Sequence, residues 1–447
     1  MIISKRSKNK KKVELLAPAG NLSKLKYAIL YGADAVYCGV PAWSLRVRIN
    51  QFTEDDLKEA IEFVHERGKK IYVTLNIYAH NMHLPEIKKH LVFLGRLGKL
   101  GFIVDGVIVS DPGIINLVKK HLPGVDIHLS TQANATNYEA VKFWKEQGVK
   151  RVILARELSL GEVREVREKV KGVELETFVH GAMCMSYSGR CILSKWMTNR
   201  SANLGDCSQP CRWRYKAVSS KRQAISEKQK MLGELKVIDD QGRYEMDVEE
   251  DRHGTYFFNS YDMNFIEHVP ELIDAGISSL KIEGRAKSAY YLAVVVRAYR
   301  KMIDAVGTAD LLSLRKIIEE QKKELDKLTH RGYTKGFLLG EEPQHNISGK
   351  LQGGEWEFVG EIESFGEVRD VGVVRVHNEV FLNDKIEAVT PDGNIPVKIR
   401  KIFDHNKKEV TEAHGGHAKR YYFQFDSGVV LPPGSLLRRK VAIRKKK

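Results

Sequence analysis

Short apolar runs rich in β-branched residues alternate with amphipathic stretches from Val13 onward. The amphipathic stretches, such as 21–33 and 54–69, have helical spacing of their apolar residues and carry a glycine where a helix C-terminus is expected. The apolar runs are nearly continuous, which is typical of parallel strands covered on both faces by crossover helices. We identify eight runs, at 13–18, 35–40, 70–76, 106–111, 127–133, 151–157, 175–181 and 279–285. Eight strand–helix units are the number in a closed (βα)8, TIM-like barrel, so we expect this α/β fold.

Polar residues stand toward the end of most of these runs. They are Asn76, Asp111, Gln132, Arg156, Glu157, His180, Glu283 and Arg285. Barrel enzymes place their chemistry at the C-terminal ends of the strands, so this gradient supports the barrel and predicts a site at that end. A doubly wound open sheet, which would show the gradient less evenly, is the structural alternative.

The seventh and eighth runs are separated by residues 184–256, which hold four of the five cysteines. We expect a Cys-rich insertion there, within a barrel domain at 13–340. Residues 341–355 have the composition of a linker because polar and turn-forming residues are concentrated in them. Short strand patterns with turn signals follow, so 356–447 is expected to form a small C-terminal all-β barrel domain that ends in a basic tail.

The composition is that of an ordinary globular protein, with 447 residues, 43% hydrophobic and 29% charged. No apolar run approaches the roughly 20 residues that a membrane-spanning helix needs. The N-terminal segment has no apolar core of the kind found in secretion signals. We therefore expect a cytoplasmic protein with no membrane partner. In that reducing compartment, clustered cysteines are more often metal ligands or catalytic groups than disulfides.

The formal net charge of +16 is concentrated near the two ends of the chain. Six Lys and Arg lie between Lys5 and Lys12, and seven lie between Arg438 and Lys447, with no acidic residue in either segment. We interpret residues 1–12 and the C-terminal segment as basic tails. They either aid solubility or add salt-sensitive affinity for a phosphate backbone, and charge alone does not distinguish these roles.

Four cysteines dominate the insertion: Cys184, Cys191, Cys207 and Cys211. The intervals between them contain six, fifteen and three residues, unlike the C-x2-C and C-x4-C pairs typical of structural zinc. Iron–sulfur clusters also use four thiolates and tolerate more varied spacing, because the cluster spans a wider cage. The spacing favours an iron–sulfur site, with zinc and redox or structural thiols as alternatives.

Two other residues bear on the chemistry of this segment. Cys38 ends the second run and is expected to be a small buried hydrophobic residue, with a role as a reserve ligand as the alternative. His180 precedes Cys184 by four residues, and a thiolate paired with a histidine base would be a cysteine-protease arrangement. This spacing at a strand end matches no known dyad, and the chain has no HExxH or GxSxG motif.

Basic residues gather near the expected rim of the barrel. The candidates for binding an anionic substrate are Arg46, Arg48, Arg156, Arg285 and Lys287. Paired arginines suit recognition of carboxylates or phosphates, although each arginine alone is more often a surface or ion-paired residue. Glu157, Glu283 and His180 are the candidate catalytic residues, as proton carriers or as groups that orient the arginines. Three amides would complete the pocket: Asn76, Gln132 and Asn134.

Nine ordered motifs resemble those of the collagenase-like peptidase family U-thirty-two, and more closely its bacterial branch that hydroxylates tRNA. The motifs are ELLAPAG (14–20), YGADAVYCG (31–39), SLRVR (44–48), HLSTQAN (128–134), RVILARELSL (151–160), FVHGAMCMSYSGRC (178–191), GDCSQPCRWRY (205–215), NSYDM (259–263) and SLKIEGRAKS (279–288). The resemblance runs from about residue 13 to 340, and the C-terminal β domain also fits the family.

The resemblance implies an enzyme that forms 5-hydroxyuridine at the tRNA wobble position, independently of molecular oxygen and with prephenate as hydroxyl donor. It also implies a 4Fe-4S iron–sulfur cluster, whose ligands would be Cys184, Cys191, Cys207 and Cys211. Prephenate carries two carboxylates, which gives the rim arginines a candidate ligand. The implied partners are tRNA and prephenate, with an electron-donor protein as a further candidate. The alternatives are a peptidase, as the family name suggests, and a non-catalytic RNA-binding cluster protein.

Overall fold

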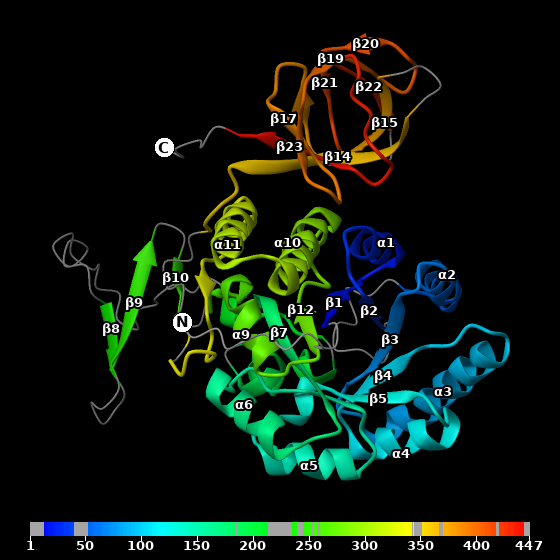
Figure 1. The fold of residues 1–447 in the computed structure, drawn as a ribbon, viewed down its shortest axis with the longest axis vertical. Coiled ribbons are helices and arrows are strands. Elements are labelled where there is room, and N and C mark those ends of the chain that lie inside the picture. Colours follow the sequence, from blue (N-terminus) through cyan, green and yellow to red (C-terminus); the bar gives the residue numbers. More distant parts are fainter. Residues whose placement is uncertain are drawn as a thin grey trace, which may run out of the picture.

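The structure is a computed structural model that describes residues 13–39, 52–184, 186–204, 206–212, 235–238, 245–251, 254–256, 260–341, 343, 351–365, 370–416 and 420–441. An α/β barrel forms the larger part. A β domain lies beside helices α1 (Leu22–Leu30), α10 (Ala289–Thr308) and α11 (Leu311–Asp326) of that barrel (Figure 1). No helix within these ranges is long and apolar enough to cross a membrane.

Eight parallel strands form the barrel and follow one another around it in chain order. They are β1 (Glu14–Pro18), β2 (Ala35–Cys38), β3 (Lys70–Leu75), β4 (Gly106–Val109), β5 (Asp126–Leu129), β6 (Arg151–Ile153), β7 (Glu174–Ala182) and β12 (Ser279–Ile282). β12 pairs in parallel with both β7 and β1, which closes the barrel. The predicted (βα)8 barrel is therefore confirmed, and the open doubly wound sheet is wrong.

Helices cover the outside of the barrel. Besides α1, α10 and α11 they are α2 (Glu54–His65), α3 (Leu84–Lys99), α4 (Pro112–His121), α5 (Tyr138–Glu146), α6 (Leu160–Lys169) and α9 (Val269–Asp274). Local sequence sets several of their starts. Thr53 at α2 accepts a hydrogen bond from the backbone of Asp56, whose carboxylate accepts one back from the backbone of Thr53, a capping box. Leu57 and Ile61 of α2, one helical turn apart, are buried against the barrel.

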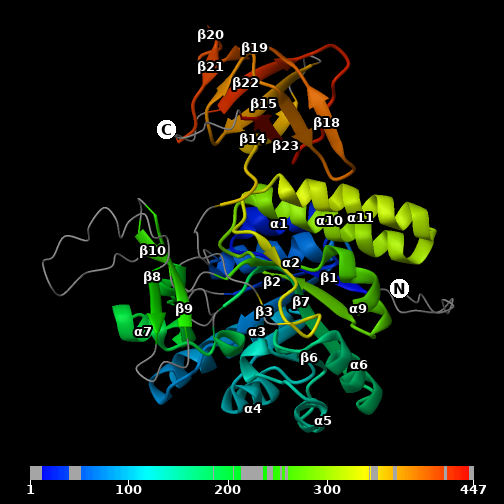
Figure 2. The same ribbon diagram turned by 90° about the vertical axis from the view of Figure 1, so that its left-hand side faces the viewer.

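The chain between β7 and β12 leaves the barrel and returns to it. It starts with four short helices: the 3-10 helix η4 (Tyr187–Gly189), the α-helix α7 (Leu193–Thr198), and the 3-10 helices η5 (Ala202–Leu204) and η6 (Pro210–Arg212). A small antiparallel sheet follows beside the barrel, made of β8 (Leu235–Ile238), β9 (Glu245–Asp251) and β10 (Gly254–Tyr256) (Figure 2). A short strand, β11 (Asp262–Asn264), then pairs with β7 and also with β13 (Tyr333–Thr334). The pairing with β13 was not predicted.

The C-terminal domain is an antiparallel sheet rolled around its own apolar core (Figure 1). Its strands are β14 (Trp356–Phe365), β15 (Val371–Val376), β17 (Ile386–Val389), β18 (Asn394–Val397), β19 (Ile399–Phe403), β20 (Glu409–Val410), β22 (Arg420–Phe425) and β23 (Leu436–Lys440). A separate ribbon joins β16 (Val380–Phe381) to β21 (Glu412–Ala413). Val359, Val374 and Phe423 are among the fully buried core residues, so the predicted all-β domain is confirmed.

Strand β23 corrects the prediction of a basic tail that starts at Arg438. This strand pairs with β14 and β17. Arg438 is fully buried and Arg439 is 8% exposed, and both are ion-paired with carboxylates. These two charges are already neutralised and are not presented to a phosphate backbone. The predicted tail at 1–12 and the last residues, 442–447, lie outside the described residues.

Candidate active site

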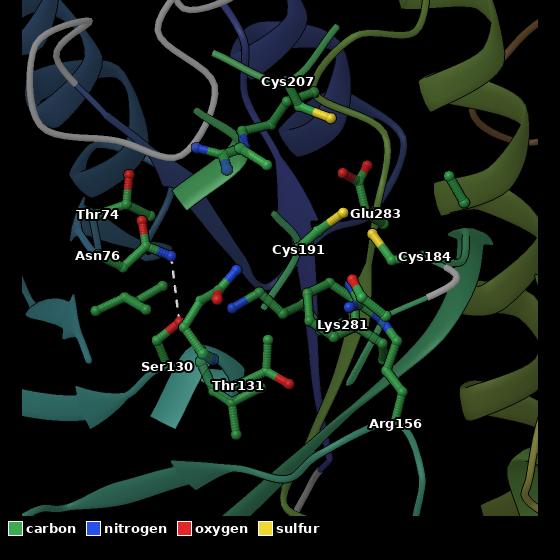
Figure 3. Close-up of a pocket in the computed structure, with 18 of the residues that line it drawn as sticks. Thr74, Asn76, Ser130, Thr131, Arg156, Cys184, Cys191, Cys207, Lys281 and Glu283 are labelled. Atoms are coloured by element: carbon green, nitrogen blue, oxygen red, sulfur yellow. Dashed lines mark hydrogen bonds between the residues drawn. The ribbon is translucent and has the colours of Figure 1, made fainter. Parts of the chain in front are cut away.

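A pocket opens at the C-terminal ends of the barrel strands, where the sequence predicts the site. Its empty volume, which includes space open to solvent at the mouth, is about 1030 Å3. The polar and charged side chains that line this strand-end pocket include Thr74, Asn76, Ser130, Thr131, Gln132, Arg156, Lys281, Glu283 and Arg285 (Figure 3). Five of the predicted site residues are therefore brought together: Asn76, Gln132, Arg156, Glu283 and Arg285.

All four cysteines of the insertion line the strand-end pocket: Cys184, Cys191, Cys207 and Cys211. Each is partly exposed, and none of them is in a disulfide. Figure 3 shows Cys184 and Cys191 directed toward one another beside Glu283, with Cys207 farther along the wall. Among the described residues, no group of three or more His, Cys, Asp or Glu is close enough to hold a single metal ion. The four thiols therefore line one pocket but are not arranged around a single-ion site.

Hydrogen bonds to Glu157 fix the cysteine segment to the barrel. The Glu157 carboxylate accepts from the backbone N–H of Ser188 at 2.7 Å and from Ser188 Oγ at 2.6 Å. On the next strand end, Arg190 Nε donates to the backbone oxygen of Gln132 at 3.3 Å. Glu157 does not line the strand-end pocket. The structure therefore shows Glu157 positioning this segment, and its predicted role as a proton carrier or as a group that orients the arginines stays a prediction.

A buried lysine forms the floor of the pocket. Lys281 is 3% exposed, and its Nζ donates to Glu176 Oε1 at 2.8 Å. Glu176 is fully buried and also accepts from Arg151 Nη1 at 3.0 Å. Burial lowers the pKa of Lys281, and Glu176 opposes that effect. Burial acts to raise the pKa of Glu176, but the two cations outweigh it and hold that pKa below its ordinary value. Glu176 is therefore ionised at neutral pH and forms an ion pair with Lys281.

Hydroxyl and amide groups form another wall. Asn76 Nδ2 donates to Ser130 Oγ at 3.2 Å (Figure 3), and the backbone N–H of Gln132 donates to the same oxygen at 3.3 Å. The Gln132 side chain is almost fully buried, and its Oε1 has no hydrogen-bond partner in the described part of the chain. A buried acceptor without a donor is unfavourable, so this atom marks a position where a ligand could donate.

His180 does not line this pocket. It is fully buried, and its ring lies 5.9, 5.5 and 5.7 Å from the rings of Tyr291, Tyr299 and Tyr333. Burial lowers the pKa of His180 to about 3, so the imidazole is neutral at pH 7. The pairing of β7 with β12 shifts register just before His180, so the alternation that places Phe178 in the pocket does not continue to His180. The predicted acid–base role of His180 in this pocket is not supported.

Other predicted residues also lie outside the pocket lining. The Nζ of Lys287 lies 5.0 Å from the centre of the Tyr291 ring, on the side of the barrel wall where His180 packs. Asn134 ends the short turn after β5 in a left-handed conformation with φ of 56°. Cys38 is buried, and burial raises the pKa of its thiol to about 12. Two predicted residues lie outside the described part of the chain: Arg46 and Arg48.

The most important residue that the sequence analysis missed is Lys281. It stands inside the apolar run SLKI, where a lysine is rare unless a buried partner neutralises it. A lysine at that position indicates a buried ion pair, because a charge within a buried strand needs a partner charge on a neighbouring strand. Ser130 and Thr131 were missed as well, although they follow β5 directly at the predicted end of the barrel.

Two family models match most of the chain. The model described as "Peptidase family U32" matches residues 20–348, and "Peptidase family U32 C-terminal domain" matches residues 354–438. The chain belongs to peptidase family U32. This assignment confirms the resemblance found in the nine sequence motifs.

Relatives of this U32 family member carry names from two kinds of chemistry. The chain is 43% identical over 433 residues to a "tRNA hydroxylation protein P" of Haemophilus influenzae, over 91% of this chain and 92% of that one. It is 36% identical over 295 residues to a 23S rRNA 5-hydroxycytidine synthase of Escherichia coli, over 66% of this chain and 40% of that one. It is 32% identical over 341 residues to a "Collagenase" of Porphyromonas gingivalis, and the match covers 73% of this chain and 74% of that one.

Proposed function

We propose that this U32 protein hydroxylates RNA and that its product is 5-hydroxyuridine at the wobble position of tRNA. Relatives named for tRNA and rRNA hydroxylation support the general reaction. The observation that carries the proposal is the strand-end pocket, whose described lining gathers four cysteine thiols, three cations and one carboxylate. A cysteine peptidase would need a thiolate with an adjacent base, and the histidine nearest in sequence to these thiols, His180, is absent from the described residues that line the pocket.

The four thiols are the proposed ligands of a 4Fe-4S cluster. The donor set fits such a group because four partly exposed cysteines line one pocket without forming a single-ion site in the described residues. A cluster distributes its thiolate ligands around a larger cage than a single ion does. Replacing C5–H by C5–OH is a two-electron oxidation of the base, so the hydroxyl donor must take up two electrons and a proton as its C–O bond breaks. A bound cluster would supply the electron transfer between the two. An electron-donor protein remains a candidate partner.

Prephenate is the proposed hydroxyl donor, and the reaction is proposed to need no molecular oxygen. Two carboxylates require cationic partners, and Arg156, Lys281 and Arg285 line the pocket. Lys281 is held in place by Glu176, so its ammonium is positioned before a ligand arrives. The predicted contributions of Arg46 and Arg48 remain predictions.

Glu283 is the proposed base of the reaction. It is the acidic residue among the described residues that line the pocket, and Figure 3 shows its carboxylate beside Cys184 and Cys191. Transfer of a hydroxyl group moves protons, and a carboxylate at the surface of the pocket that would hold the hydroxyl donor is suited to carry one. The neutral, fully buried His180 is not suited to the same task.

Nucleoside mass spectrometry tests this function directly. Protein purified and reconstituted without air is incubated with unmodified tRNA and prephenate, and the digested tRNA is analysed for 5-hydroxyuridine. We expect product that depends on both protein and prephenate and that forms without oxygen. Unmodified uridine after incubation with protein of full cluster content would contradict the proposal.

A peptidase is the second candidate, supported by the relative named "Collagenase". The same preparation is tested for release of peptides from gelatin, and we expect none above the buffer blank. RNA binding without any modified nucleoside would instead indicate the third alternative, a non-catalytic RNA-binding cluster protein.

A further inference from the structure

A second pocket shares a wall with the strand-end pocket. This side pocket has an empty volume of about 670 Å3. Its lining residues are Arg156, Glu157, Met183, Cys184, Ser186, Tyr187, Ser188, Ser260, Phe337 and Pro343. Arg156, Cys184 and Ser186 line both pockets. Two separate binding spaces therefore meet at one thiol and one arginine, which suits a reaction between two substrates.

The two pockets differ in chemistry. The strand-end pocket contains Lys281 and Arg285 besides the shared Arg156, and it suits a small anion. The side pocket is flanked by Tyr187, Phe337 and the apolar side chain of Met183. Flat aromatic ligands such as nucleobases bind to aromatic faces through stacking.

Tyr187 is an exposed aromatic residue held by a fixed backbone. It is 63% exposed. The next residue, Ser188, has φ of 36° and ψ of 37°, an uncommon conformation for a residue other than glycine. Both of its hydrogen-bond contacts to Glu157 stabilise that conformation. The strained backbone at Ser188 thus holds the Tyr187 ring in an exposed position.

Polar groups on the shared wall are suited to the edge of a base. The Nε of Arg156 and the Oγ of Ser186 are both buried and have no hydrogen-bond partner within the described ranges. Arg156 Nε is a donor, and a hydroxyl both donates and accepts. A pyrimidine has carbonyl oxygens and ring nitrogens along its edge, so it can satisfy both groups while its face contacts Tyr187.

The surrounding segment has the charge of a phosphate-binding surface. Four basic residues and one acidic residue, Asp206, lie between residues 186 and 212. Arg190 and Lys195 are exposed, whereas Arg200 is paired with Asp206 at 3.0 Å. Exposed cations beside an exposed aromatic ring are the combination that binds single-stranded nucleic acid.

We propose that the side pocket receives the target pyrimidine of a single-stranded RNA loop, stacked on Tyr187, while the strand-end pocket holds the small anionic hydroxyl donor. This assignment rests on the proposed function and adds where each substrate binds. The wall that contains Cys184 lies between the two substrates. The pyrimidine would have to leave the loop's base stack to enter, as in other enzymes that modify bases.

The test uses the full-length, cluster-containing protein and an anticodon stem-loop RNA with pyrrolocytidine, a fluorescent pyrimidine, at the wobble position. Wild-type protein is expected to bind the RNA and change the fluorescence of the probe. Tyr187→Ala should weaken binding by about tenfold or more and abolish the fluorescence change, because stacking is lost. Tyr187→Phe keeps the ring and should stay within about twofold of wild type.

A matched control is Phe143→Ala, which removes an exposed aromatic ring from α5, outside both pockets. It should leave RNA affinity unchanged. Tyr187→Ala should also leave the affinity for prephenate unchanged, since that ligand is assigned to the other pocket. Unchanged RNA affinity and fluorescence in Tyr187→Ala would overturn the assignment. Peptide cleavage that depends on Tyr187, with RNA binding that does not, would overturn it as well.

The outcomes separate this assignment from the proposed function. If wild-type protein binds the loop in a Tyr187-dependent way but yields no hydroxylated nucleoside, the assignment stands and the proposed reaction is wrong. If wild-type protein forms 5-hydroxyuridine and Tyr187→Ala does so with unchanged kcat/KM, the reaction stands and the assignment is wrong.

Discussion

Arg438 in β23 and Glu324 in α11 form a buried bidentate ion pair that joins the C-terminal domain to the barrel. Nη1 lies 2.8 Å from Oε1, and Nη2 lies 3.1 Å from Oε2. Arg297 of α10 adds a third hydrogen bond to the same carboxylate, at 2.9 Å. Elsewhere in the interface, the hydroxyl of Tyr27 donates to Glu361 at 2.7 Å. The β domain is thus fixed to the barrel by specific polar contacts.

Replacing Arg438 should therefore destabilise the folded protein. Arg438→Met leaves the buried carboxylates of Glu324 and Glu387 with one fewer cation, and removing one partner of a buried pair costs about 3–5 kcal/mol. We expect the free energy of unfolding in urea to fall by about that amount. Lys440→Met, in the same strand but exposed, is the control and should change it by less than about 0.5 kcal/mol. Equal stabilities of the two variants would contradict the interface described here.

The same pair predicts a loss of stability in acid. Burial acts to raise the pKa of Glu324, but Arg438 and Lys327 outweigh it and lower that pKa to about 2, from 4.5. A carboxyl with a lowered folded-state pKa stabilises the protein above its unfolded pKa and loses that contribution as pH falls through the folded one. The stability difference between wild type and Glu324→Gln should therefore be largest above pH 4.5 and shrink toward pH 2. Urea titrations at several pH values measure it, with exposed Glu320→Gln as control. A difference that stays constant between pH 7 and 3 would contradict the assignment.

Much of the barrel was predictable because its signals are local. Each strand is an apolar run of a few residues, and the order of strands follows from the right-handed connection of successive strand–helix units. Strand β23 was missed for a physical reason. Its sequence, LLRRK, ends in three basic residues, which predict exposure to solvent. The fold instead brings Glu324 and Glu387, which are distant in sequence, to Arg438. Tertiary partners of this kind are not visible along the chain.

The candidate site was predictable to a similar degree. Strand ends and the cysteine segment were identified from position alone, and the structure brings most of them into one pocket. His180 was misplaced because a register shift in β7 changes which side chains point inward, and such a shift has no clear sequence signal. The positioning role of Glu157 was not predicted because its partner, Ser188, belongs to the insertion.

Lys281 should determine affinity for the anionic donor. Lys281→Met removes a buried ammonium from the pocket floor, and hydrogen bonds to charged groups contribute enough that KM for prephenate should rise by about tenfold or more. Lys287→Met is the matched control, since Lys287 lies beside Tyr291 outside the pocket lining and its removal should leave KM nearly unchanged. Lys281→Arg keeps a positive charge beside Glu176, so it controls for misfolding caused by the loss of that charge. Equal KM values in the two methionine variants would show that the floor does not bind the donor.

Glu157 should control the order of the cysteine segment without contributing much to global stability. Glu157→Ala removes both hydrogen bonds to Ser188, so trypsin should cleave within residues 186–212 several-fold faster than in wild type. Glu165→Ala, an exposed change on α6, provides the comparison. If both variants are cleaved at the wild-type rate, Glu157 does not hold the segment.

The four pocket cysteines should act as one set, and Cys38 should not belong to it. Cys184→Ser, Cys191→Ser, Cys207→Ser and Cys211→Ser each remove one thiolate donor from the same pocket, so each should lose most of its iron and its visible absorbance after anaerobic reconstitution. Cys38→Ala should retain both, because Cys38 is 1% exposed and burial raises the pKa of its thiol to about 12, which disfavours the thiolate that a metal needs. Iron and acid-labile sulfide per chain are the quantities to measure. Loss of the cluster in Cys38→Ala, with retention in Cys211→Ser, would exchange those two residues in the ligand set.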